Sequence, residues 1–135
     1  MAERSETSEW MSIESDLDLV LARSRVRDAG ATQGMALPAI EALATATTEI
    51  ARNMIVHARG GELSVSAADG KRGVVVVARD RGPGIAQLAL AMQDGYSTAG
   101  GLGLGLPSAK RLVDGLEIVT EPGRGTIVTM TKWVP

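Results

Sequence analysis

Three short segments of the sequence carry side chains or backbone that could bind a small charged molecule. Glu49 and Asn53 lie four residues apart in a segment with helical periodicity, so they share one helix face. Asp80 begins an Asp-Arg-Gly-Pro-Gly segment shortly after a run of four valines, which puts a carboxylate at the end of a predicted strand. The glycine-rich run 100–106 leads into another helix, and backbone N–H groups at such a point form a cradle for anions, phosphate above all.

The first two segments have simpler explanations when each is considered alone. Glu49 and Asn53 are better explained as a solvated polar stripe, and residues 80–84 equally well as an ordinary turn. The glycine-rich run is harder to explain as a bare connector, and its glycines favour a mobile lid. A Walker A loop is absent, because the only Gly-Lys pair is followed by Arg72 rather than by Ser or Thr.

Hydrophobic periodicity predicts the elements that must position these segments. A second predicted helix over Pro38–Ala58 carries Glu49 and Asn53. It follows a helix that Ser15 begins and that runs to about Ala29, ahead of a break at 30–34. The remaining predictions are strands at 10–13, 62–67, 74–77 (covered on both faces), 116–120 and 126–133, helices at 85–92 and 106–113, and a glycine-rich loop at 94–105. Helices early and antiparallel strands late predict an α+β fold, with a mixed sheet and helices on one face.

Composition limits the function classes. The 135 residues suffice for one domain, and we expect a disordered N-terminus at 1–9 and a single domain at 10–135. The net charge of −2 offers no positive excess for nucleic acid, and no apolar run approaches the ~20 residues that span a bilayer. We therefore expect neither a nucleic-acid nor a membrane partner. The absence of cysteine excludes disulfides and thiolate chemistry and favours a cytoplasmic location.

The order of the three segments resembles a known ATP-binding domain. The arrangement resembles that of the GHKL ATPases, which include gyrase, histidine kinases and MutL. Its three parts are Glu-x3-Asn on a helix, Asp-x-Gly-x-Gly after a strand, and a glycine-rich lid before a helix. The segment Asp94–Pro107 (DGYSTAGGLGLGLP) is similar to the RsbT-type serine/threonine kinases, a group that resembles anti-sigma factors. The resemblance extends from Trp10 over nearly the whole chain. It implies a Bergerat-type two-layer sandwich with a glycine-rich ATP lid.

The resemblance also implies a role for each matching residue. Asp80 would accept a hydrogen bond from the adenine amino group of ATP, and Thr126 would assist through water. Asn53 would hold Mg²⁺ beside the phosphates. Glu49 would be the general base on a serine or threonine hydroxyl. The nucleotide-binding set implied in this way is Asn53, Asp80, Gly82, Gly84, Ile85, Ser97, Thr98, Gly100, Gly101, Leu102, Gly103, Leu104, Gly105, Leu106 and Thr126.

Protein partners follow from the same resemblance. RsbT-type kinases phosphorylate small STAS-domain antagonist proteins and stressosome scaffold proteins, and then bind a downstream partner, typically a phosphatase. We therefore expect a bacterial partner-switching kinase that uses ATP and Mg²⁺. The alternative is a nucleotide-gated binding module or anti-sigma factor that acts by sequestration with little turnover. Glu49 argues against a purely non-catalytic module, because binding of ATP does not need it.

Overall fold

The computed structural model describes residues 9–85, 92 and 105–135. Within these ranges the strands form a five-stranded sheet in the order β1-β2-β3-β5-β4, and every neighbouring pair is antiparallel. The predicted mixed sheet is therefore wrong for this part of the chain; the hairpins that join β2 to β3 and β4 to β5 account for two of the four antiparallel pairs. The elements are β1 (Met11–Ile13), α2 (Asp16–Thr32), α3 (Leu37–Ala58), β2 (Gly61–Ala67), β3 (Gly73–Asp80), α6 (Leu106–Leu112), β4 (Gly115–Glu121) and β5 (Gly125–Trp133).

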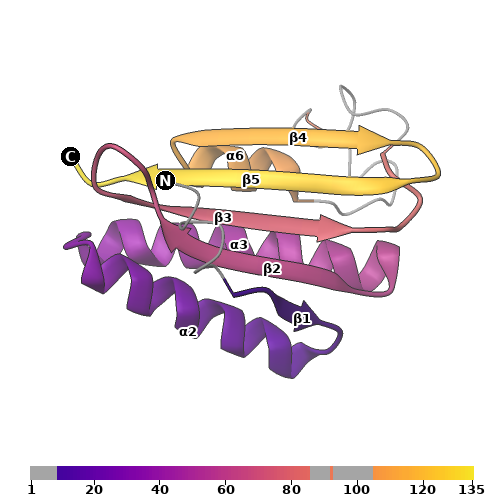
Figure 1. Ribbon diagram of the computed structural model, residues 1–135, viewed down its shortest axis with the longest axis horizontal. Coiled ribbons are helices and arrows are strands. Elements are labelled where there is room, and N and C mark those ends of the chain that lie inside the picture. Colours follow the sequence, from indigo (N-terminus) through magenta and orange to yellow (C-terminus); the bar gives the residue numbers. More distant parts are fainter. Residues whose placement is uncertain (1–8, 86–91, 93–104) are drawn as a thin grey trace.

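The described helices lie on one side of the sheet. Figure 1 shows α3 and α6 crossing behind the strands and α2 running beside β1. On β3, Val74 and Val76 are fully buried, whereas Val75 and Val77 are half-buried. The prediction that this strand is buried on both faces is therefore wrong, because Val75 and Val77 point away from the helices. The largest fully buried side chains, which form the core between the two layers, are Ile13, Leu43, Leu63, Leu106, Met130, Val26, Val74 and Val76.

The helix α2 continues through the predicted break at Gly30 and ends at Thr32. Gly30 is buried inside the helix, and a Cβ there would lie 2.7 Å from Cγ1 of Ile40 on α3. The glycine therefore lets the two helices approach closely instead of ending α2. The chain turns only at Gly34, whose φ of +79° suits glycine.

The helix α3 lies where the sequence predicts it and ends at Ala58; the C-cap residue Arg59 has a left-handed backbone with φ 63°. None of the described helices is long and apolar enough to cross a membrane. The predicted helix at 85–92 and the predicted loop at 94–105 fall outside the described residues, except for Ile85, Met92 and Gly105.

Candidate functional site

The end of the β3–β5 ladder brings Asp80 and Thr126 side by side. They are direct partners in the antiparallel register, so their side chains project from the same face of the sheet. That face is the one covered by helices, because Ala78 and Val128, two residues along each strand, are buried. Thr126 is buried and Asp80 is half-buried, and Oδ1 of Asp80 accepts a hydrogen bond from the Gly82 amide at 2.9 Å.

Residues 81–85 form a loop that packs between α3 and the β4–β5 turn. A Cβ on Gly82 would collide with Ala58 at the end of α3. A Cβ on Gly84, whose φ is +74°, would collide with the carbonyl oxygen of Glu121. Glycine is therefore required at both positions, because neighbouring chain occupies the space that a side chain would need.

The hydroxyl of Thr120 on β4 connects that loop to Thr126. It accepts a hydrogen bond from the Ile85 amide at 2.8 Å, lies 2.9 Å from Oγ1 of Thr126 and donates to the Gly125 carbonyl oxygen at 3.3 Å. Thr120, which is 35 residues from Ile85, is not among the site residues predicted from the sequence. The only available signal was the β4–β5 hairpin, which pairs Thr120 directly with Thr126.

Glu49 and Asn53 lie one turn apart on α3, and both side chains are half-buried. α6 begins at the buried Leu106, and the preceding Gly105 has a left-handed backbone with φ +66°. A Cβ at Gly105 would lie 2.7 Å from Oε1 of Glu49. The Glu49 carboxylate therefore faces the point where the glycine-rich segment enters α6.

α3 connects these two groups of residues. Glu49 lies against Gly105, and Ala58, nine residues further along the helix, lies against Gly82. At the ordinary rise of an α-helix this separation is about 14 Å along the axis. α3 therefore sets the distance between the two groups.

Part of the predicted site cannot be placed. The predicted ligand-binding residues that fall outside the described ranges are Ser97, Thr98, Gly100, Gly101, Leu102, Gly103 and Leu104. In the ranges that the structure does describe, no group of three acidic or histidine side chains could hold a metal ion by itself. The amide oxygen of Asn53 is chemically suited to Mg²⁺, which takes oxygen ligands.

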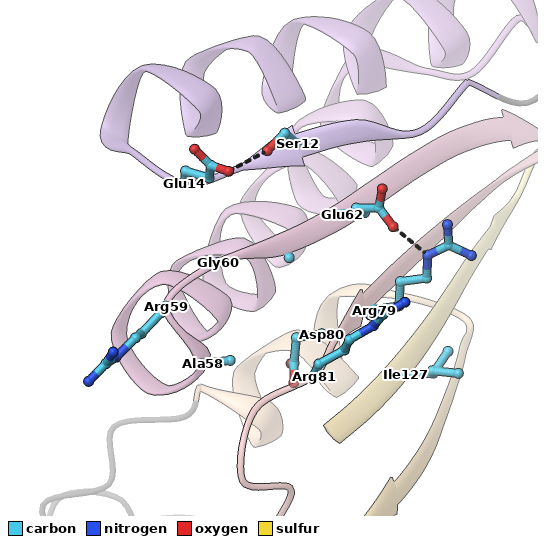
Figure 2. Close-up of a pocket in the computed structure, with 11 residues that line it drawn as sticks. Ser12, Glu14, Ala58, Arg59, Gly60, Glu62, Arg79, Asp80, Arg81 and Ile127 are labelled. Carbon is cyan, nitrogen blue, oxygen red and sulfur yellow. Dashed lines mark hydrogen bonds and ion pairs between the residues drawn. The ribbon is translucent and has the colours of Figure 1, made fainter. Parts of the chain in front are cut away.

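A cleft of about 690 Å³ opens beside Asp80 (Figure 2). Of the described residues predicted for the site, only Asp80 lines it. Arg79 forms an ion pair with Glu62 at 2.8 Å, and its guanidinium lies 3.6 Å from the centre of the Trp10 ring. Figure 2 shows the Asp80 side chain pointing away from the Arg79–Glu62 pair. The sequence analysis did not anticipate this cleft, whose other lining residues are Ser12, Glu14, Ala58, Arg59, Gly60, Gly61, Arg81 and Ile127.

Comparison with known proteins identifies the family of the chain. The family model of the histidine kinase-like ATPase domain matches residues 13–132, nearly the whole chain. The chain therefore belongs to the family of histidine kinase-like ATPase domains, as the sequence resemblance predicted. Within it, the chain is 37% identical over 124 residues to the serine/threonine-protein kinase RsbT of Bacillus subtilis (strain 168), an alignment that covers 90% of this chain and 93% of that protein. This similarity places it with the RsbT-type serine/threonine-protein kinases.

The chain is also similar to an anti-sigma factor and, in its fold, to a solved structure. The chain is 31% identical over 106 residues to an anti-sigma F factor of Thermoanaerobacter sp. (strain X514), with 72% of this chain and 74% of the relative covered. The crystal structure of the RsbU and RsbW domains of a Mycobacterium tuberculosis protein superposes with a TM-score of 0.62 at 21% identity. That alignment covers 93% of this chain but 32% of the longer one, and it confirms the two-layer α+β fold.

Proposed function

We propose that this protein is an ATP-dependent serine/threonine kinase of a bacterial partner-switching pathway that acts in the cytoplasm. Its substrates would be STAS-domain antagonist and stressosome scaffold proteins, after whose phosphorylation it binds a downstream partner such as a phosphatase. The observation that carries the proposal is that Glu49, within α3, lies against Gly105, while Gly82, two residues after the paired Asp80, lies against Ala58 at the end of the same helix.

Asp80 and Thr126 supply the selection of the base. A carboxylate accepts hydrogen bonds and donates none when it is ionised. Adenine presents an amino group with N–H donors, whereas guanine presents a carbonyl oxygen at the corresponding position. Asp80 therefore favours adenine and repels guanine, and Thr126 lies beside it to complete the contact.

The phosphate end of the site combines Asn53, the backbone of residues 100–106 and Mg²⁺. Asn53 offers one neutral oxygen, which suits a cation that keeps several waters and takes its remaining oxygens from phosphate. The bound cation would neutralise charge on the phosphates. Gly105 and Leu106 are the described residues through which the backbone cradle continues into α6.

Glu49 is the general base in this proposal. Its carboxylate takes the proton of the serine or threonine hydroxyl of the protein substrate as that oxygen forms a bond to the γ-phosphorus of ATP. The bond from the γ-phosphorus to the bridging oxygen breaks, and ADP leaves. Phosphoryl transfer requires mainly positioning and charge stabilisation, so α3 contributes by holding Glu49 and Asn53 one turn apart.

The test is phosphotransfer from Mg-ATP to a STAS-domain antagonist of the same organism, read by mass spectrometry. Phosphoserine or phosphothreonine is expected with the natural protein and with Glu117→Gln, a change at an exposed glutamate on β4. Glu49→Gln, which keeps the size of the side chain but removes the base, is expected to lower the rate by about 10²–10⁴. Equal rates for Glu49→Gln and Glu117→Gln would exclude Glu49 as the base.

A second candidate function is sequestration of a partner with little turnover. The similarity to an anti-sigma F factor favours it. In that case the natural protein would form a tight ATP-dependent complex with its partner and transfer no phosphate. Glu49→Gln would then bind the partner as well as the natural protein does.

A further inference from the structure

The Thr120 hydroxyl makes three contacts, and their geometry limits where its single hydrogen can point. The Ile85 amide can only donate to it. The Gly125 carbonyl oxygen can only accept from it. A hydroxyl offers one donor and two acceptor positions, so all three contacts are hydrogen bonds only if Thr126 donates its own proton to Thr120.

This proton arrangement determines what Thr126 presents to a ligand. Once the Thr126 hydrogen is directed at Thr120, the free positions on Oγ1 of Thr126 are acceptors. Thr126 lies beside Asp80, whose ionised carboxylate is also an acceptor. The two residues together then present acceptors only, which matches the amino group of adenine and opposes the carbonyl oxygen of guanine.

We propose that Thr120 is a positioning residue for base selection. Its hydroxyl orients the Thr126 hydroxyl so that the Thr126 oxygen can accept a hydrogen bond from the base, and it also holds the Ile85 amide in place. The proposal rests on the proposed function, because it takes the Asp80–Thr126 pair as the base subsite. Thr120 itself acts through Thr126 and need not touch the ligand.

The surroundings hold Thr120 in place for this role. Its strand partner is Thr126, in the last pairs of the β4–β5 hairpin. The Gly123 amide in the following turn donates to the Pro83 carbonyl oxygen at 2.7 Å, so the turn and the 81–85 loop are joined at a second point. The loop that follows Asp80 and the hairpin that carries Thr126 therefore form one hydrogen-bonded unit.

The experiment measures the dissociation constants of Mg-ATP and Mg-GTP by calorimetry for the natural protein, four single variants and one double variant. Thr120→Val keeps the shape of the side chain and removes the hydroxyl, and we expect the preference for ATP over GTP to fall about tenfold. Thr120→Ser should restore it. Thr126→Val alone should also lower the preference for ATP over GTP. Adding Thr120→Val to Thr126→Val should cause no further loss of this preference, because Thr120 acts through Thr126. Thr129→Val, on the opposite face of β5, is the matched control.

Amide hydrogen exchange of Ile85 in the nucleotide-free protein separates positioning from structural support. Thr120→Val should lose protection at Ile85, and Thr120→Ser should keep it. Lost protection with an unchanged ATP preference would reduce Thr120 to a structural role and overturn the proposal. Additive effects of the two threonine changes would overturn it as well. Failure of the natural protein to prefer ATP would instead contradict the proposed function itself.

Discussion

The backbone of Gly105 runs against the Glu49 carboxylate, with room for a hydrogen atom but none for a methyl group: a Cβ would lie 2.7 Å from Oε1 and 3.3 Å from the carboxyl carbon. The two residues are far apart in sequence and meet because α6 packs on α3. The start of α6 thereby restricts the positions open to the Glu49 side chain.

Gly105→Ala should reduce phosphotransfer more than tenfold, because the added methyl group displaces the Glu49 carboxylate and strains a left-handed backbone. Gly70→Ala is the matched control, since Gly70 has φ +85° and nothing within 4 Å of its added Cβ. Both changes share the backbone cost of about 1–2 kcal/mol. Thermal unfolding and phosphotransfer rates are compared. An equal loss of rate in the two variants would mean that the displacement of Glu49 is unimportant.

Asp80→Asn should weaken ATP binding at least tenfold with little change in stability. The asparagine oxygen can still accept the Gly82 amide, but its NH2 group opposes the adenine amino group. Calorimetric titration with ATP and with GTP measures the effect, and Asp28→Asn, at an exposed position on α2, is the control. ATP affinity equal to that of the control would exclude Asp80 as the acceptor for the base.

Gly30→Ala should destabilise the protein by about 1–3 kcal/mol through overpacking against Ile40, although alanine is the better helix former by about 1 kcal/mol. The test is a double-mutant cycle by chemical denaturation. In an Ile40→Ala background, which removes the atom that the new methyl group meets, Gly30→Ala should become neutral or stabilising. Equal effects of Gly30→Ala in both backgrounds would contradict the close helix contact.

Glu41→Gln should lower the melting temperature at neutral pH and leave it unchanged in acid. The hydrogen bond from Arg27, at 2.9 Å, holds the pKa of Glu41 below its ordinary value. The folded carboxyl thus binds its proton less tightly than the unfolded one. Its stabilising effect is present above the ordinary value of about 4.3 and is lost as the pH falls through the lowered pKa.

The expected change at Glu41 is small because both partners of the ion pair are partly exposed to solvent, with 48% of the Arg27 side chain and 40% of the Glu41 side chain accessible. The change in melting temperature is measured for Glu41→Gln and for the control Glu117→Gln at several pH values, at low and high salt. A difference from the natural protein that grows toward acid pH would show that the sign of this argument is wrong.

The sequence could predict the parts of the fold that depend on local pattern. The helical spacing around Glu49 located α3, and the β-branched run before Asp80 located β3. The pairing of Asp80 with Thr126 needs the order of strands in the sheet, which no local pattern indicates; the family resemblance implied only that both residues serve one site. The contacts of Thr120 with Ile85 and of Gly105 with Glu49 leave no local signal, because each joins distant parts of the chain.

The wrong predictions for Gly30 and for the valines of β3 also arise from contacts between distant parts of the chain. Glycine commonly ends a helix, so Gly30 predicted a break, but the packing of α2 on Ile40 requires a residue without a side chain. Four consecutive valines are typical of strands buried on both faces, yet Val75 and Val77 lie on a sheet face that no described helix covers. In both cases tertiary contacts decided what the local pattern left open.

The role of α3 as a rigid connection has a consequence for changes in chain length. One residue inserted between Asn53 and Ala58 would rotate the helix beyond it by about 100°, so the Ala58 surface that meets Gly82 would no longer align with Glu49. One residue deleted there would rotate it equally far in the opposite sense. The length of α3 between Glu49 and Ala58 therefore cannot change by a single residue without separating the two groups that this helix aligns.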